Sequence, residues 1–374
     1  MTEPDTVDWT PLIDRLGEPG ALAATGLAIG FAFGFLAQRS RFCLRSAVIE
    51  FSRNLVGGKL TVWLFAFATA LVATQALTLL GAFSAAEARQ ISARGSLSGA
   101  AIGGALFGVG MIPARGCSSR LLVLAAQGNL RSVISGLVFA VVAQASWTGL
   151  LAPAREGLAG LWTVDGGASR DLVQVLHIGH GGALAFGLLW LAAAVFWARR
   201  QRVPVWGWAG AIGVGLTIAA AWWATYSISR SAFDPHPIQA LSFTGPSAEV
   251  LTRTLFASDK PLNFDLGLMP GVFLGSFVAA WLFKELKLEG FSGGAPMRRA
   301  LTGAACMGFG GMLAGGCAVG AGLSGAAVFT MTSWVTLTAM WAAAALTDRL
   351  VDQRPQPAAP LDEAMPGRPA PAHP

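Results

Sequence analysis

Three of the four cysteines stand where a long apolar segment is interrupted. Each closes a short stretch rich in arginine or glycine: Gln38-Arg39-Ser40-Arg41-Phe42-Cys43, Ala114-Arg115-Gly116-Cys117 and Ala314-Gly315-Gly316-Cys317. A thiol is a weak hydrogen-bond donor, and it suits a large, polarizable acceptor such as the terminal sulfur of an anion. The nearby arginines would attract such an anion and could also activate a thiol for covalent chemistry. The spacing therefore favours either an anion pathway or a set of reactive thiols.

Other residues that could do metal or redox chemistry have simpler interpretations. Cys306 lies inside an apolar segment, where a cysteine usually packs as a small hydrophobic residue. No two cysteines have the C-x-x-C spacing of a redox pair or a zinc knuckle. His177 and His180 are three residues apart with no third ligand near them, so we expect a structural role at the membrane interface. We predict neither a metal nor another cofactor.

Short helices are predicted directly after three interruptions, at residues 118–127, 246–255 and 318–329. A helix N-terminus presents unpaired N–H groups and a partial positive charge, which can hold an anion inside a membrane protein. A further interruption, Leu241–Pro246, carries hydroxyl groups and no cysteine. The predicted substrate pathway comprises Cys43, Cys117 and Cys317, and the predicted anion-binding residues are Arg115, Gly116, Ser118, Ser242, Thr244, Gly315 and Gly316.

The distribution of carboxylates also favours an anion. No aspartate or glutamate occurs between residues 88 and 155, 172 and 233, or 290 and 347. A cation or proton pathway normally needs carboxylates inside the membrane. Glu50 and Asp265 are the two near membrane depth, and we interpret both as interfacial. A nucleotide-binding P-loop is also missing, so the sequence indicates no ATP-driven transport.

These residues must be positioned by membrane-spanning helices. Of the 374 residues, 54% are hydrophobic and 12% are charged, about half the charged fraction of a soluble protein. The net charge of +6 is scattered over the ends of apolar segments, which argues against nucleic-acid binding. Nine spans are predicted, at residues 21–38, 60–83, 97–114, 132–151, 181–198, 205–224, 266–286, 300–314 and 331–347.

Nine spans would place the two termini on opposite sides of the membrane. One set of connections then holds eighteen of the 26 lysines and arginines and the other set holds eight. The positive-inside rule puts the richer set in the cytoplasm. We therefore predict an extracytoplasmic N-terminal tail over residues 1–19, a permease domain over 20–350, and a disordered cytoplasmic tail over 351–374.

The permease domain contains a weak internal repeat. Leu97-Ser98-Gly99-Ala100-Ala101 resembles Leu301-Thr302-Gly303-Ala304-Ala305, and a Gly-Cys pair follows each. The repeats are predicted at about residues 20–152 and 204–348, joined by a linker span at about 170–200. An odd linker span would invert the second repeat relative to the first, as in many transporters. Glycines four residues apart within several spans predict close helix packing.

At the interruptions the sequence resembles the YeeE/YedE family of sulfur-transport membrane proteins. The resemblance covers about residues 21–347, and the matching stretches are Ser40–Cys43 with Arg45–Ala47, Ala114–Cys117, Leu241–Ser247, Asp265–Gly267 with Pro270, Gly271, Gly275 and Ser276, and Leu313–Cys317 with Gly320, Gly322 and Leu323–Gly325. It implies an hourglass-like fold of full and shorter helices in the bacterial inner membrane. It also implies import of thiosulfate, passed from Cys317 to Cys43 and Cys117 by S–H···S contacts, and a small cytoplasmic sulfur-carrier protein as partner.

Two departures from the family pattern bear on the substrate. Arg115 stands where a small residue is also common, and Gly320-Ala321-Gly322 replaces a more polar sequence. Relatives linked to selenium metabolism leave a selenium compound as an alternative substrate. A membrane sulfurtransferase that forms cysteine persulfides would use the same three thiols. A structural membrane scaffold would need none of them.

Overall fold

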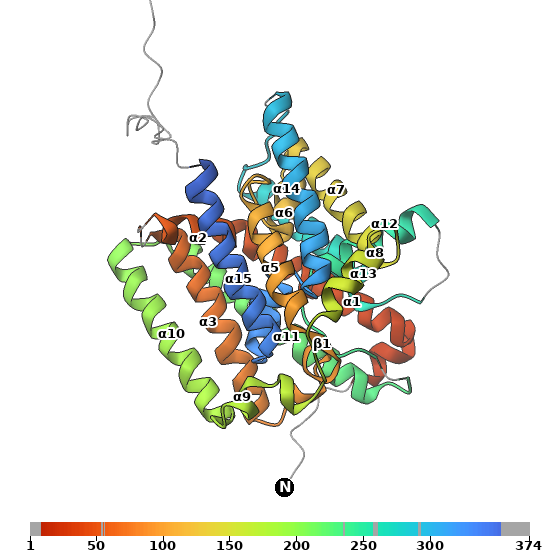
Figure 1. The fold of residues 1–374 in the computed structure, drawn as a ribbon. Coiled ribbons are helices and arrows are strands. Elements are labelled where there is room, and N and C mark those ends of the chain that lie inside the picture. The colour runs from red at the N-terminus through yellow and green to blue at the C-terminus, as the bar shows by residue number, and fades with distance from the viewer. Residues whose placement is uncertain are drawn as a thin grey trace, which may run out of the picture.

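The computed structural model describes residues 9–53, 55, 57–234, 236–256, 261–290 and 293–352. Helices make up most of this part of the chain (Figure 1). The α-helices are α1 (Thr10–Ser40), α2 (Leu44–Ser52), α3 (Gly58–Leu79), α4 (Arg89–Ser92), α5 (Leu97–Met111), α6 (Ser118–Ala126), α7 (Leu130–Trp147), α8 (Ala152–Gly160), α9 (Leu172–Val175), α10 (Gly179–Gln201), α11 (Val205–Ser231), α12 (Thr244–Phe256), α13 (Phe264–Leu282), α14 (Gly294–Leu313) and α15 (Met331–Thr347).

Shorter elements complete the described chain. Two 3-10 turns, η1 (Ala85–Glu87) and η2 (Ala168–Arg170), lie in connections. Two π-helical segments, η3 (Gly320–Gly325) and η4 (Asp348–Asp352), flank α15. The strands β1 (Gly95–Ser96) and β2 (Thr163–Val164) form one short antiparallel pair.

Each of the nine predicted spans coincides with a helix. Within the described residues, six segments are long and apolar enough to cross a membrane: the α1–α2 segment Thr10–Ser52, α3, α7, α10, α11 and α13. Helix α5 is apolar but has 15 residues. The predicted all-α, multi-pass membrane architecture is confirmed, while the span count of nine stays a prediction.

The helical region extends beyond the predicted permease domain at both ends. Helix α1 begins at Thr10 and changes direction at Gly17, whose φ is +70°. At the other end, η4 reaches Asp352. Residues 1–8 of the predicted N-terminal tail and 353–374 of the predicted C-terminal tail lie outside the described residues.

Glycines let α1 and α13 cross with their backbones in direct contact. Gly26, Gly30 and Gly34 face α13 at the four-residue interval seen in the sequence. A Cβ atom at Gly34 would lie only 2.2 Å from the carbonyl oxygen of Val272. No side chain fits there, so the crossing depends on glycine, as close helix packing in lipid generally does.

Helices α5 and α14 cross in the same manner and run antiparallel. Gly99 lies against the Leu313 carbonyl at one end, and Gly110 lies against the Gly303 carbonyl at the other. The sequence segments that follow these helices, which carry Cys117 and Cys317, therefore leave the crossing at opposite ends.

Helix contacts come in matched pairs between the two halves of the chain. Contacts of α1 with α13 correspond to those of α11 with α3, and contacts of α5 with α15 correspond to those of α14 with α7. Short segments obey the same rule: α2 packs on α3 and α12 on α13, while α6 packs on α7 and η3 on α15. Helix α10 stands at one edge beside α3 (Figure 1). A two-fold relation between the halves would require this pattern, although the boundaries at 20–152, 170–200 and 204–348 stay a prediction.

We predict that Gly34→Ala destabilises the α1–α13 crossing by about 1–3 kcal/mol, because the methyl group must displace a backbone carbonyl. Thermal unfolding in detergent should show a lower midpoint. The matched control is Gly136→Ala in α7, where nothing lies within 4 Å of an added Cβ. Equal thermal unfolding midpoints for both variants would show that the crossing can accommodate a methyl group, contrary to the distances in the structure.

Candidate functional site

Cys43 and Cys117 form a buried pair of thiols. Each is the residue directly before a nine-residue helix, Cys43 before α2 and Cys117 before α6, and each has an extended backbone. Their exposed fractions are 7% and 1%. The two side chains lie close enough to interact electrostatically, and the Ser119 hydroxyl lies 3.4 Å from Cys117 Sγ. The fold thus brings together two predicted pathway residues that are 74 positions apart in the sequence.

Arg120 adds a cation beside this pair. It lies in the first turn of α6, within electrostatic reach of both thiols. Its Nη1 nitrogen is shut off from solvent and has no hydrogen-bond partner among the described residues. From the sequence alone, Arg120 is only one of the eighteen basic residues predicted on the cytoplasmic side. The sequence did offer one sign of its proximity to the thiol: Arg120 lies three residues after Cys117, in the first turn of the helix that follows this cysteine.

Cys317 lies in a separate buried turn and has no exposed surface. The chain reverses at Gly315, whose φ is +74°, and the Gly320 N–H donates to Cys317 Sγ at 3.4 Å. The short helix predicted over 318–329 is found as the π-helix η3, which covers residues 320–325. Three glycines in six residues make this wider, less regular backbone accessible.

Hydroxyl groups of the fourth interruption lie beside the Cys317 turn. A Cβ at Gly320 would come within 2.5 Å of Ser242 Oγ, so the two residues are in contact. Ser324 of η3 donates to the Leu241 carbonyl at 2.7 Å. Thr244 is 1% exposed, and its hydroxyl has no partner among the described residues. The predicted helix at 246–255 is confirmed as α12, which begins two residues earlier, at Thr244.

The other predicted anion-binding residues divide into buried and exposed ones. Ser118 begins α6 with a buried hydroxyl that has no partner in the described chain. Gly116 is buried next to the Arg120 side chain, and Gly316 lies against the Ala321 N–H. Arg115 and Gly315 are exposed, and Arg115 has a φ of +58°. The structure therefore does not place Arg115 or Gly315 in either buried cluster.

The two cysteine clusters lie at opposite ends of the α5–α14 crossing described above. The cluster of Cys317, Ser242 and Thr244 follows the Gly99–Leu313 end, and the pair Cys43–Cys117 follows the Gly110–Gly303 end. Such an arrangement provides two stations for an anion, each built on helix breaks enclosed by protein, with the helix crossing between them.

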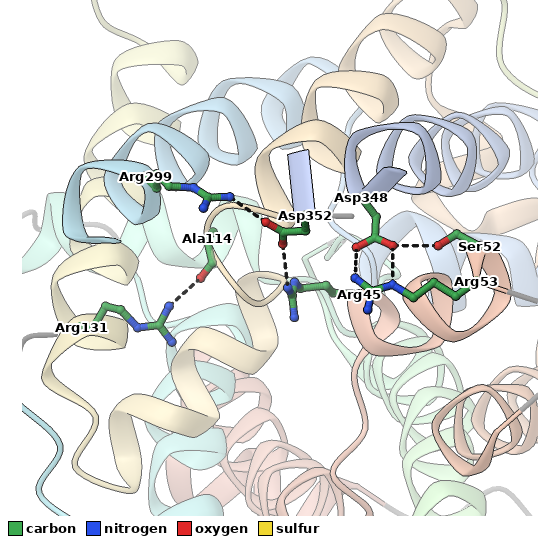
Figure 2. A network of polar contacts seen from close by, with 8 residues as sticks. All are labelled: Arg45, Ser52, Arg53, Ala114, Arg131, Arg299, Asp348 and Asp352. Atoms are coloured by element: carbon green, nitrogen blue, oxygen red, sulfur yellow. Dashed lines mark hydrogen bonds and ion pairs between the residues drawn. The ribbon is translucent and has the colours of Figure 1, made fainter. Parts of the chain in front are cut away.

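A network of ion pairs anchors α2, the helix that Cys43 begins (Figure 2). Asp348 has a fully buried side chain and pairs with Arg53 at 2.9 Å. Ser52 also donates to this carboxylate, at 2.9 Å. Because a buried carboxylate is costly unless it is paired, these contacts fix the end of α15 against α2.

The next charged residue along η4 extends the same network. Asp352 lies 2.8 Å from Arg299 of α14 and 3.7 Å from Arg45 of α2 (Figure 2). Arg131, at the start of α7, donates to the Ala114 carbonyl at 3.4 Å. The ion pairs thus connect α2, η4 and α14, so the helix that Cys43 begins is held by charges as well as by packing. Arg131 separately joins α7 to the segment that precedes Cys117.

The chain matches the protein family described as sulphur transport over residues 39–346. It belongs to this family. It is 26% identical over 359 residues to a protein of Escherichia coli (strain K12) named thiosulfate transporter TsuA, covering 90% of this chain and 96% of that protein. A protein of the same name from Spirochaeta thermophila is 27% identical over 326 residues, covering 83% of this chain and 93% of that protein. The resemblance inferred from the interruptions is confirmed.

Of the two departures from the pattern of the sulfur-transport family, one touches the site. Arg115 is exposed, away from the buried clusters. Residues 320–322 lie in η3, where Gly320 contacts both Cys317 and Ser242. A difference in substrate preference within the family would therefore be expected from η3 before it is expected from Arg115.

The membrane-depth carboxylates and the histidines have structural contacts. Glu50 accepts a hydrogen bond from the Leu60 N–H at 2.9 Å and so helps to cap α3. His180 Nδ1 lies 3.0 Å from Gln75 Oε1. Asp265 lies in the first turn of α13, where the helix dipole stabilises a negative charge. Within the described residues, no group of three or more His, Cys, Asp or Glu could hold a metal.

We predict that mild oxidation joins Cys43 to Cys117, because the two thiols are near neighbours. Mass spectrometry of the digested protein should find this disulfide and should find Cys306 and Cys317 as free thiols. The variant Cys43→Ser should leave Cys117 as a free thiol that can be alkylated after the same treatment. If the oxidant reaches the buried thiols and all four cysteines are still recovered as free thiols, the proximity of Cys43 and Cys117 is contradicted.

Proposed function

We propose that this chain is a permease that carries thiosulfate, or a similar sulfur-containing anion, inward across the bacterial inner membrane. Membership of the sulfur-transport family supports a sulfur substrate, and the two relatives named as thiosulfate transporters indicate which one. The observation that carries the proposal is the burial of three cysteines in two clusters at helix breaks. In a purely structural membrane protein, buried hydroxyl groups and an arginine beside the thiols would cost free energy without serving a substrate.

The clusters suit both ends of a thiosulfate ion. A thiol can donate a weak hydrogen bond to the terminal sulfur, while the oxygens can accept from hydroxyl groups such as those of Ser242 and Thr244. Moving an unpaired charge into an apolar medium is very costly. The helix N-termini that begin at Ser118 and Thr244 offset part of this cost without a fixed countercharge that would trap the ion.

The order of the two clusters along the path follows from the proposed orientation. With the N-terminus outside and the C-terminus in the cytoplasm, Cys317 belongs to the outer cluster and the pair Cys43–Cys117 to the inner one. The distribution of eighteen against eight basic residues supports this orientation. We further propose that a small cytoplasmic sulfur-carrier protein accepts the sulfur that leaves the inner cluster.

We predict that the purified chain in liposomes takes up radiolabelled thiosulfate. Cys317→Ala, Cys43→Ala and Cys117→Ala should each lower the initial rate at least tenfold, because each removes a donor along the path. Cys306→Ala is the matched control and should transport normally, since Cys306 lies inside α14 away from both clusters. Normal uptake by all four variants would show that the cysteines only pack against their neighbours and do not contact the substrate.

Failure of the wild-type chain to take up thiosulfate would refute thiosulfate as substrate. Uptake of another sulfur or selenium anion by the same liposomes would then keep the permease and change its cargo. Deletion of the gene in a host without other thiosulfate uptake should abolish growth on thiosulfate as sulfur source. Undiminished growth would argue against the proposal.

The proximity of Cys43 to Cys117 favours one alternative, a membrane sulfurtransferase. The thiolate of one cysteine would attack the terminal sulfur of thiosulfate, the S–S bond would break, and sulfite would leave with the electron pair. The resulting persulfide could pass its outer sulfur to a carrier protein. We predict that intact-protein mass after exposure to thiosulfate shows no added sulfur. A gain of one sulfur atom at Cys43 or Cys117, with release of sulfite, would support the sulfurtransferase and contradict simple passage.

A further inference from the structure

A polar cavity of about 350 Å³ opens next to the thiol pair, on the side of Arg120 that faces α13 and its following loop. Its lining side chains include Gln38, Arg41, Arg120, Gln127, Lys284 and Lys287. The rim reaches solvent, because the Arg41 side chain is 76% exposed. Four cations therefore surround a space large enough for a small hydrated anion.

The carboxylates of the cavity are already engaged. Glu285 accepts hydrogen bonds from Gln38 at 2.9 Å and from Arg39 at 3.1 Å. Glu289 accepts from the Asn129 amide. The Arg120 guanidinium, by contrast, has an enclosed Nη1 nitrogen without a hydrogen-bond partner among the described residues.

An enclosed guanidinium nitrogen without an acceptor is costly, since a buried charged donor needs a partner. A planar guanidinium matches the oxygens of an oxyanion and can bind two of them at once. Arg120 is also within electrostatic reach of both Cys43 and Cys117. Arg120 therefore lines the cavity and also lies within electrostatic reach of the thiol pair, so its guanidinium links the two.

We propose that Arg120 and this cavity form an oxyanion-binding station that takes the transported anion from the Cys43–Cys117 pair before it leaves the protein. The station binds the oxygen end of the anion, whereas the thiols contact the sulfur end. Its place after the thiol pair rests on the proposed function and orientation. Glu285 and Glu289 limit the net positive charge of the cavity, so that binding stays weak enough for release.

Equilibrium binding of radiolabelled thiosulfate to the full-length chain tests this station. We use a Cys317→Ala background, so that the outer cluster does not contribute. Arg120→Gln should weaken binding at least tenfold, and Arg120→Lys should restore part of the affinity because it keeps the charge but loses the planar fork. Gln127→Glu adds a carboxylate to the lining and should weaken binding comparably while leaving Arg120 in place. The control Arg298→Gln removes an exposed arginine outside the cavity and should bind normally.

The outcomes separate the station from the permease. Unchanged affinity in folded Arg120→Gln or Gln127→Glu, or no thiosulfate binding by the background chain, overturns the station whether or not wild-type liposomes take up thiosulfate. Binding that depends on Arg120, in a chain whose wild type transports no thiosulfate, leaves the oxyanion-binding site standing and refutes thiosulfate as the transported substrate. In a transporting chain, Arg120→Gln should lower the maximal uptake rate at least tenfold with little change in KM, because the outer cluster is intact.

Discussion

The structure depends on one constraint: in hydrocarbon every backbone N–H and C=O group must find a partner within the protein. A helix can therefore break inside the membrane only where other helices enclose the break. The glycine crossings of α1 with α13 and of α5 with α14 bring backbones close enough to build that enclosure. Short helices such as α2, α6 and α12 then fit between the long ones, and their N-termini point at buried thiols and hydroxyls. The chemistry of the site is a consequence of where the helices are allowed to break.

The two clusters present different chemistry on a common frame. One combines the single thiol of Cys317 with hydroxyls of Ser242 and Thr244, and the other combines two thiols with the guanidinium of Arg120. Matched helix contacts surround both. A neutral cluster at one end and a cationic one at the other would give an anion a gradient of attraction along the path, with the thiols providing selectivity for sulfur.

Local patterns in the sequence predicted the frame well. Apolar segments of membrane length and glycines at four-residue intervals indicated the spans and their crossings, because both are properties of one helix. Interruptions by glycine and arginine likewise indicated the positions of Cys43, Cys117 and Cys317. The proximity of Cys43 to Cys117 could not be predicted, since it depends on how α2 and α6 pack. The hydrogen bonds from Gln38 and Arg39 to Glu285 also depend on tertiary packing, and so could not be predicted either. The same holds for the Arg120 Nη1 nitrogen, which has no hydrogen-bond partner among the described residues. The π-helical form of η3 could not be predicted, because its glycines permit several backbone forms and the sequence pattern does not choose among them.

The backbone-to-backbone crossings also restrict how a solute can pass. Rocking one half of the protein against the other would require α1 to slide over α13, and carbonyl oxygens seated against glycine Cα atoms oppose that movement at three successive turns. Movement during passage would therefore be expected in the short segments at the breaks before it is expected between the halves. Without such rocking, no large displacement of the described helices would be available for an ion gradient to drive, so the solute's own gradient, maintained by its consumption inside the cell, would set the direction of flow.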